Sequence, residues 1–393
     1  MQLLQIFNQY LESGGEEEWV NQMLQLGGDS FSIADLRFHS GAWMGRGAPS
    51  IWRQATLLWN HPLARQRLRN MISKVRPDLL LFHNLIPVAS LGMYHEARNL
   101  GLPVVQYIHN FRPFSPSGTM WLRGKVNDAA VRGNPWPEVL GRSWERSFLK
   151  TFLLASYQRQ LLTNGTLDVV KRWIAVSDFM REKFIEGGIA PERVVTLRHC
   201  WQPAPTQARI PEGKHYLFLG RLVSEKGIHT LIDAWAILEK RMGPNCPRLI
   251  IAGSGSEEAR CHARADRMNR VTCIGFVTGA PKVDLLRSCR GLIAPSIWWE
   301  PLGLIVHEAY DSARPVLAAR SGGLTETVIE GVTGYLHEPG NAEQLANNVE
   351  QLETMGCAGR AELGRQGHQW LIDHASPDEW RQRFVSILRE AKG

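Results

Sequence analysis

Residues 294–309 read APSIWWEPLGLIVHEA, and this stretch decides which fold we expect for the chain. A compact apolar run ends at Ala294, a loop marked by proline follows, and a helical pattern begins near Gly303. The first amides of a helix have no partners within the helix, and the helix dipole is positive at that end. We therefore expect a buried strand, a loop and a helix whose start, at Gly303 and Leu304, binds a diphosphate.

Two carboxylates flank this expected phosphate site. Glu300 lies in the loop before the helix, where it can reach a sugar, and Glu308 lies over a turn further on, where it can accept hydrogen bonds from ribose hydroxyls. A simpler interpretation stays open, in which both are exposed acids that stabilise the helix dipole.

A second loop carries two cations. Residues 218–227 read FLGRLVSEKG, which places Gly220 and Arg221 at a strand end and Lys226 just before the next helix. Such cations suit the neutralisation of a pyrophosphate and of its departing charge, although each could also be an ordinary surface residue.

Two further glycine-bearing loops follow apolar runs in the same half. Residues 252–255 read AGSG, so that Gly253 and Ser254 let a nucleotide approach the backbone closely. Residues 321–326 read SGGLTE and offer free amides at another helix start.

Short apolar runs alternate with helical patterns along the whole chain. The runs that we predict to be buried parallel strands are 3–7, 79–82, 104–108, 173–176, 194–197, 215–218, 248–251, 271–274, 291–294 and 315–318. This alternation predicts an α/β protein with two doubly wound domains and ligand loops at the carboxyl ends of the strands.

The length of 393 residues also suits two domains. A proline-bearing stretch without periodicity follows residue 200, so we expect an N-terminal domain at 1–202, a linker at 203–213 and a C-terminal domain at 214–375. Residues 376–393 form a capped terminal helix that could pack back on the N-terminal domain.

Residues from about Tyr216 to Val349 resemble the donor domain of the family 4 GT-B glycosyltransferases. They contain, in order, G-R-L-x-x-E-K-G, A-G-x-G, P-S-x-x-x-E-P-x-G-L-x-x-x-E-A, G-G-x-x-E-x-V and G-x-T-G-x-L. The resemblance implies a GT-B fold, with two Rossmann-like domains that face each other across a cleft. It also implies transfer of a sugar from a nucleotide-diphosphate donor with retention of anomeric configuration.

Roles for the matching residues are implied by the same resemblance. Arg221 and Lys226 would bind the donor diphosphate and stabilise the leaving group, and Glu300 would bind hydroxyls of the donor sugar. The remaining donor contacts would come from the loop residues Gly220, Gly253 and Ser254, from the phosphate-binding amides of Gly303 and Leu304, from Glu308 at the ribose and from Val277 at the base.

The first half matches the family less closely. Gly14 and Gly15, soon after the first expected strand, are similar to the family's glycine loop that faces the donor phosphates and the acceptor. His109 follows the expected strand 104–108 and resembles the family's histidine that approaches the transferred sugar. His83 ends another expected strand and is a second candidate contact. A histidine at a strand end is often only structural, and that interpretation stays open for both.

The positive charge of the chain lies in its first half. Residues 1–200 contain 23 Lys and Arg against 16 Asp and Glu, whereas the rest of the chain is balanced. Basic and aromatic residues alternate between Trp121 and Arg172, which favours contact with an anionic bilayer or, equally, an ordinary two-helix insertion with a solvated basic face. No nucleic-acid-binding motif accompanies these cations, so we expect no nucleic-acid partner.

Composition indicates the compartment. The six cysteines have no metal-like spacing, no secretory signal is evident, and no run of 18 apolar residues occurs. We therefore expect a cytoplasmic protein, at most peripheral on the inner face of the membrane.

No Asp-x-Asp pair stands where a metal would bind, so we expect no metal and no other cofactor. The expected reaction is transfer of a hexosyl group from a nucleotide-diphosphate sugar to a glycan or lipid-linked glycan in cell-envelope polysaccharide biosynthesis. UDP-sugars and GDP-mannose both fit the motifs, and we favour a UDP-hexose. Two alternatives remain: a nucleotide-sugar-binding protein without transferase activity, and a GT-B sugar-nucleotide epimerase.

Overall fold

The computed structural model describes residues 1–11, 14–205 and 211–393 of the chain. Contacts divide these residues into two compact units. The first unit comprises Met1–Arg123, Asn127–His199 and Pro377–Gly393, and the second comprises Gly124–Val126 and Cys200–Ser376. Residues 206–210 of the expected linker lie outside the described residues.

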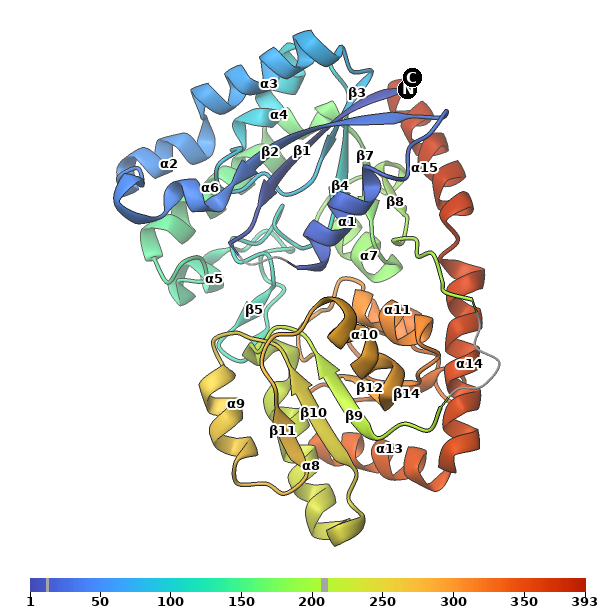
Figure 1. Cartoon of the computed structure of the whole chain (residues 1–393). Coiled ribbons are helices and arrows are strands. Elements are labelled where there is room, and N and C mark those ends of the chain that lie inside the picture. Colours follow the sequence, from blue (N-terminus) through green and yellow to red (C-terminus); the bar gives the residue numbers. More distant parts are fainter. Residues whose placement is uncertain (12–13, 206–210) are drawn as a thin grey trace. The chain divides into compact units, whose positions relative to one another are not determined.

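The first unit contains a six-stranded parallel sheet in the order β2-β1-β3-β4-β7-β8 (Figure 1). The strands are β1 Gln2–Gln9, β2 Ser32–His39, β3 Leu79–Phe82, β4 Val104–Ile108, β7 Val170–Ala175 and β8 Val194–Thr196. The strand order reverses between β1 and β3. The loops that follow these two neighbouring strands therefore separate and leave a crevice at the carboxyl edge of the sheet.

Helices of the first unit lie between these strands in the sequence, except α15, which follows the second unit. They are α1 Gly15–Met23, α2 Ile51–Trp59, α3 Pro62–Val75, α4 Gly92–Asn99, α5 Trp136–Gly141, α6 Phe148–Thr163, α7 Asp178–Glu186 and the C-terminal α15 Pro377–Lys392. Two very short strands, β5 Trp121–Leu122 and β6 Lys125–Val126, precede α5 in the sequence. Helix α3 contacts β1 and β2, and α15 contacts β4 and β7, so the last helix of the chain completes the first unit.

The second unit contains its own six-stranded parallel sheet, in the order β11-β10-β9-β12-β13-β14. The strands are β9 His215–Leu219, β10 Arg248–Ala252, β11 Val271–Cys273, β12 Cys289–Ala294, β13 Val316–Ala319 and β14 Gly334–His337. Here the strand order reverses between β9 and β12, which is the arrangement of a Rossmann sheet.

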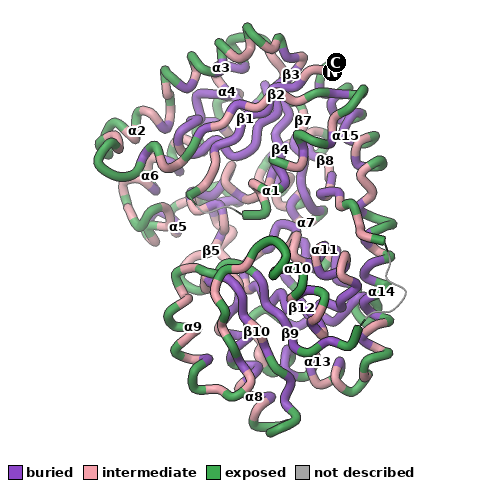
Figure 2. The backbone as a smooth tube through the Cα atoms, viewed as in Figure 1, coloured by how far each residue is buried: buried purple, intermediate pink, exposed green. Residues whose placement is uncertain are grey.

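Helices of the second unit are α8 Ile228–Met242, α9 Glu258–Ala265, α10 Gly279–Ser288, α11 Leu304–Asp311, α12 Leu324–Thr327, α13 Ala342–Thr354 and α14 Gly356–His374. Apolar side chains fill the space between sheet and helices, with one cluster around Trp235 and another around Tyr310. Figure 2 shows the central strands of both sheets as buried along their length.

The expected α/β fold with two Rossmann-like domains is confirmed by these two sheets. All ten predicted strands are present, with ends that shift by up to three residues. Four strands of the described residues were not predicted: β2 and β14, which are edge strands of the two large sheets, and the two-residue strands β5 and β6.

Candidate functional site

The loops that follow β9 and β12 open at the same edge of the second unit's sheet. The two strands are paired neighbours, and the strand order reverses between them. The loop from Gly220 to Gly227 follows β9, and the loop from Pro295 to Gly303 follows β12. A ligand that binds in the crevice of a doubly wound sheet meets such loops.

Glycines allow these loops to pack backbone against backbone. Gly227 has a φ of 73°, and a Cβ placed on it would lie 1.9 Å from the carbonyl oxygen of Pro295. A Cβ on Gly253, in the loop after β10, would lie 1.8 Å from the carbonyl oxygen of Gly220. No side chain fits at either position, so both glycines are required by the close approach.

Lys226 and Glu300 form an ion pair between the two loops. Nζ of Lys226 lies 2.9 Å from Oε1 and 2.6 Å from Oε2 of Glu300. The hydroxyl of Ser296 and the indole N–H of Trp298 also donate hydrogen bonds to Oε2 of Glu300, over 2.9 and 3.0 Å. Burial alone would raise the pKa of Glu300, but Lys226 and these hydrogen bonds outweigh it, and the pKa lies below 4.5. The carboxylate is therefore ionised and held in one orientation.

The start of α11 lies beside this ion pair. Gly303 precedes the helix with a φ of 83°, and Leu304 is its first residue. A Cβ on Gly303 would lie 3.6 Å from Cγ of Glu300. The first free amides of α11 are thus close to the Lys226–Glu300 pair.

Four other residues of the expected donor site differ in their surroundings. Arg221 is exposed, and its side chain makes no ion pair with any residue that the structure describes. Glu308 forms an ion pair with Lys282 of α10, with 2.6 Å between Oε2 and Nζ. Val277 is half-buried and packs against the apolar cluster around Tyr310. Ser254 accepts a backbone hydrogen bond of 2.7 Å from Leu222, which ties its loop to the Arg221 loop.

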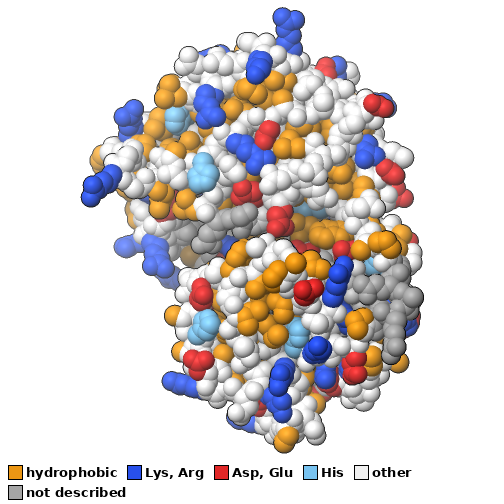
Figure 3. All heavy atoms as spheres, viewed as in Figure 1, with side chains coloured by type: hydrophobic (Ala, Val, Ile, Leu, Met, Phe, Trp, Pro, Cys, Tyr) orange, Lys and Arg blue, Asp and Glu red, His pale blue; other side chains and the backbone are white. Residues whose placement is uncertain are grey.

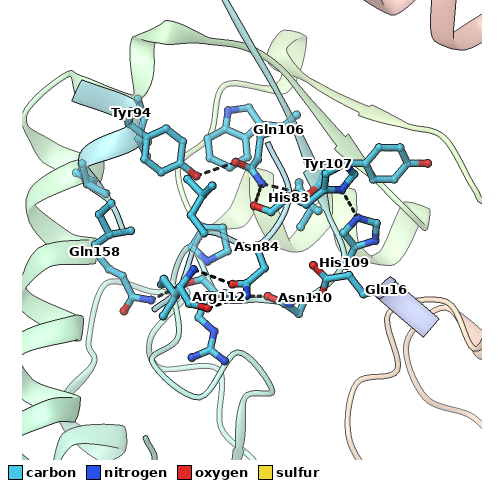
Figure 4. Close-up of a pocket in the computed structure, with 18 residues that line it drawn as sticks. Glu16, His83, Asn84, Tyr94, Gln106, Tyr107, His109, Asn110, Arg112 and Gln158 are labelled. Carbon is cyan, nitrogen blue, oxygen red and sulfur yellow. Dashed lines mark hydrogen bonds between the residues drawn. The ribbon is translucent and has the colours of Figure 1, made fainter. Parts of the chain in front are cut away.

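The first unit contains a pocket at its own point of strand reversal. Figure 4 shows the side chains that line it, which include Glu16, His83, His109, Asn110 and Arg112. The pocket has an empty volume of about 540 Å³, part of it open to solvent. It lies where the loops after β1, β3 and β4 meet, and these loops carry the expected site residues of the first half.

The two histidines of the pocket are hydrogen-bonded to each other. Nδ1 of His83 lies 2.9 Å from Nε2 of His109, and the ring of His109 stacks on Tyr107 with 4.9 Å between ring centroids. Burial lowers the pKa of His109 to about 3, and it also lowers the pKa of His83 well below 6.5. Both rings are therefore neutral near pH 7.

Glu16 is an ionisable residue of the pocket to which the sequence reasoning gave no role. Gly14 is the N-cap of α1 and Gly15 its first residue, so Glu16 lies in the first turn. The hydroxyl of Tyr10 and the amide of Asn110 donate to its Oε2, over 2.9 and 3.1 Å. Burial raises the pKa of Glu16 to about 7, although the hydrogen bond from Tyr10 opposes this.

Gln5 is a second residue that was missed, although the sequence contains a signal for it. It is the one polar residue in the predicted strand 3–7, and an amide buried in a strand needs hydrogen-bond partners. Its side chain is fully buried, and Oε1 lies 3.1 Å from Nε2 of His83.

Two family models together match most of the chain. Residues 205–370 match the model described as glycosyl transferases group 1, and residues 44–200 match the model described as glycosyltransferase family 4. The glycogen synthase of Mycobacterium tuberculosis is 34% identical over 329 residues, which cover 79% of this chain and 70% of that protein. The chain belongs to the group 1 glycosyltransferases.

Other glycosyltransferases match over different lengths. The α-D-kanosaminyltransferase of Streptomyces kanamyceticus is 26% identical over 78% of this chain and 74% of its own length. An uncharacterised glycosyltransferase of Methanocaldococcus jannaschii is 35% identical, but the match spans only 35% of each chain.

Solved structures share the fold of this glycosyltransferase. The Anabaena protein Alr3699/HepE, solved in complex with UDP, superposes with a TM-score of 0.69 at 19% identity, over 99% of this chain and 100% of that one. The sucrose-phosphate synthase of Thermosynechococcus elongatus gives a TM-score of 0.70 at 16% identity, over 99% and 98% of the two chains. These likenesses support the GT-B fold.

Proposed function

We propose that this glycosyltransferase transfers a hexosyl group from a UDP-sugar to a glycan or lipid-linked glycan acceptor in cell-envelope polysaccharide biosynthesis, with retention of anomeric configuration. The observation that carries the proposal is the Lys226–Glu300 ion pair beside the start of α11, at the strand reversal of the second unit. A cation, an oriented carboxylate and free helix amides at one crevice suit a sugar diphosphate.

Each part of the donor has a matching group in this arrangement. The diphosphate would lie against Lys226 and the amides of Gly303 and Leu304, with Arg221 as a second cation. Glu300 would accept hydrogen bonds from hydroxyls of the sugar, and Glu308 would bind the ribose. Because these cations and amides would stabilise the leaving diphosphate, we propose that transfer needs no metal ion.

Relatives support the finer parts of the proposal. Alr3699/HepE has been solved with UDP-glucose, which favours a UDP-hexose as donor. A lipopolysaccharide core biosynthesis glycosyltransferase of Rhizobium meliloti is 26% identical over half of this chain, which favours an envelope glycan as acceptor. The pocket around His109 would receive the transferred sugar or the acceptor.

A donor screen followed by a transfer assay tests the proposal. UDP-, GDP-, ADP- and TDP-sugars are compared by the rise in melting temperature that they cause, since a bound ligand stabilises the folded protein by RT ln(1 + [L]/Kd). We expect a UDP-hexose to give the largest rise, and UDP release to persist in EDTA. Lys226→Ala and Arg221→Ala should each lower kcat by roughly 10²–10³-fold, whereas the exposed Lys240→Ala should not. Full turnover in both folded site variants would refute the donor site.

We also propose that the first unit binds an anionic membrane surface. Residues 36–77 contain eight Lys and Arg and no Asp or Glu. Apolar side chains are exposed in the same stretch, with Met44, Trp52 and Leu63 at 59%, 69% and 66% exposure. Figure 3 shows Lys and Arg side chains at the margin of this unit over α2 and α5. Exposed aromatic residues among cations suit the interface of an anionic bilayer.

The segment with alternating basic and aromatic residues lies next to α2. Helix α6 contacts both α2 and α5, and Trp136 of α5 lies 6.0 Å from Phe152 of α6 between ring centroids, with both side chains exposed. In the described part of the chain, no helix has the length and apolar character needed to cross a bilayer.

Vesicle binding tests this contact. Cosedimentation with phosphatidylglycerol vesicles should fall by at least about tenfold when Arg46→Glu and Arg53→Glu are combined, and should fall with rising salt. Arg389→Glu, at an exposed position of α15, is the matched charge reversal and should change binding little. Equal binding to neutral phosphatidylcholine vesicles would contradict an electrostatic contact.

A further inference from the structure

A chain of hydrogen bonds in the first unit begins at groups that can only accept. Nε2 of Gln5 lies 3.2 Å from Oδ1 of Asp35 and 3.4 Å from the carbonyl oxygen of Val20, and Asp35 is itself paired with Arg37. A carboxylate and a carbonyl cannot donate, so the NH2 group of Gln5 must face them. The oxygen of the same amide therefore faces His83.

The orientation of Gln5 decides which nitrogen of His83 carries hydrogen. Oε1 of Gln5 lies 3.1 Å from Nε2 of His83 and can only accept, so the hydrogen of the neutral His83 is on Nε2. Nδ1 of His83 is then bare. It lies 2.9 Å from Nε2 of His109 (Figure 4), which must donate to it.

The same logic fixes the second ring. A neutral His109 has one ring hydrogen, and because that hydrogen is on Nε2, its Nδ1 is bare. Nδ1 has no hydrogen-bond partner among the residues that the structure describes, and His109 lines the pocket. The stacking on Tyr107, with 4° between the ring planes, holds the ring in this orientation.

We propose that Gln5 is a positioning residue: through His83 it holds His109 in the tautomer whose bare Nδ1 accepts a hydrogen bond from a hydroxyl of the sugar that enters this pocket. The identity of that ligand rests on the proposed function, but the tautomer does not. His109 in this state cannot donate a proton or a hydrogen bond into the pocket. The group that meets it must be a donor, as a sugar hydroxyl is.

Nitrogen NMR of the whole protein labelled with 15N-histidine tests the tautomer directly. The chain has 13 histidines, and the signal of His109 is assigned by its loss in His109→Gln. We expect His109 to show a protonated Nε2 and a bare Nδ1 from pH 6 to 9, without any ligand. A protonated Nδ1 in the wild-type protein would overturn the inference.

Two glutamine variants separate positioning from general structural support. Gln5→Met removes the acceptor of His83 and should give His109 a mixture of tautomers. Gln106→Met is the matched control, because Gln106 is a buried glutamine of β4 that contacts the backbone of His83 rather than its ring. It should leave the tautomer of His109 unchanged. An unchanged tautomer in folded Gln5→Met would also overturn the inference.

Modified donors test the ligand. Two analogues are compared at each position of the sugar, one with fluorine and one with hydrogen in place of the hydroxyl. At the position that meets His109, both should bind about tenfold more weakly than the natural sugar, because neither fluorine nor hydrogen can donate a hydrogen bond to Nδ1. This loss should disappear in His109→Phe. If fluorine is tolerated at every position where hydrogen is not, His109 does not accept from the sugar. If no sugar nucleotide binds or reacts at all, the proposed function fails while the NMR result stands.

Discussion

Glu16 shows how one residue can make the stability of a glycosyltransferase depend on pH. In the unfolded chain its carboxyl titrates near 4.5, and in the folded protein burial raises the pKa to about 7. The folded protein therefore holds this proton more tightly. The contribution of Glu16 to the free energy of unfolding is fully present below pH 4.5 and decreases as the pH rises toward 7. Above pH 7 this contribution is absent.

Glu16→Gln removes this dependence. Between pH 5 and pH 8.5 the wild-type protein should lose about 2.5 kcal/mol of unfolding free energy relative to the variant, since one pKa unit corresponds to about 1.4 kcal/mol. Urea unfolding followed by tryptophan fluorescence at both pH values measures the difference. Stability profiles that run parallel in the two proteins would mean that Glu16 titrates normally.

The Lys226–Glu300 ion pair makes stability depend on pH in the opposite direction to Glu16. Lys226→Met leaves a carboxylate that is only 8% exposed without its cation, so we expect a loss of about 2 kcal/mol at pH 7. Because the pKa of Glu300 is lowered, this coupling is present above pH 4.5 and disappears as the pH falls through the lowered value. A double-mutant cycle with Glu300→Gln measures it. A coupling that does not change at low pH would contradict an ionised Glu300.

At the scale of single elements, the close approach of two loops depends on Gly227. Gly331 is a matched control, because its φ is 72° against 73° for Gly227, and nothing lies within 4 Å of a Cβ placed on it. Alanine at either position should cost about 1 kcal/mol of left-handed strain.

Gly227→Ala has to displace the carbonyl of Pro295 as well. We expect at least about 2 kcal/mol of additional destabilisation and a weaker affinity for UDP, measured by thermal unfolding and titration calorimetry. Gly331→Ala should bind UDP normally. If the two variants behave alike, the loop contact does not position the donor site.

Elements differ in how well the sequence predicts them. Buried strands such as β4 read as continuous apolar runs, and the helix start at Gly303 is marked by its loop, so both could be predicted. Strand β2 could not, since only Leu36 and Phe38 are buried in it and charged residues intervene. Strand β14 has four residues and begins with glycine, which weakens any strand signal.

The first-unit pocket is predicted only in part, for a different reason. His83 and His109 stand out at strand ends, but their hydrogen bond joins residues 26 positions apart and depends on the pairing of β3 with β4. Gln5 and Glu16 acquire their roles from burial and from partners on other strands. Such contacts between residues far apart in the chain cannot be predicted from the sequence pattern of either segment.

At the scale of the whole molecule, the stability of the first unit depends on the last 17 residues. Helix α15 buries Trp380, Phe384 and Leu388, and Trp380 lies 5.3 Å from Trp19 between ring centroids. Deletion of Pro377–Gly393 should therefore unfold the first unit, since each large apolar side chain contributes about 2 kcal/mol.

The second unit should survive this deletion and keep the UDP binding that we propose for it. Hydrogen exchange with mass spectrometry measures the amide protection of the two units separately. Trp380→Ala is a milder variant, for which we expect a loss of about 3–5 kcal/mol in the unfolding free energy of the first unit. Protection of β1 and β4 that persists after the deletion would contradict this role of α15.

The two ends of the chain meet within one unit: the carboxylate of Asp78 accepts a hydrogen bond from the backbone amide of Gln2 and pairs with Lys392. During translation, β1 leaves the ribosome long before α15, the helix that packs on its sheet. Apart from Gly124–Val126, the second unit is made of Cys200–Ser376. It can therefore fold before α15, which belongs to the first unit, has been synthesised. A nascent chain therefore has to keep the apolar surface around Trp19 from aggregating until α15 has been made.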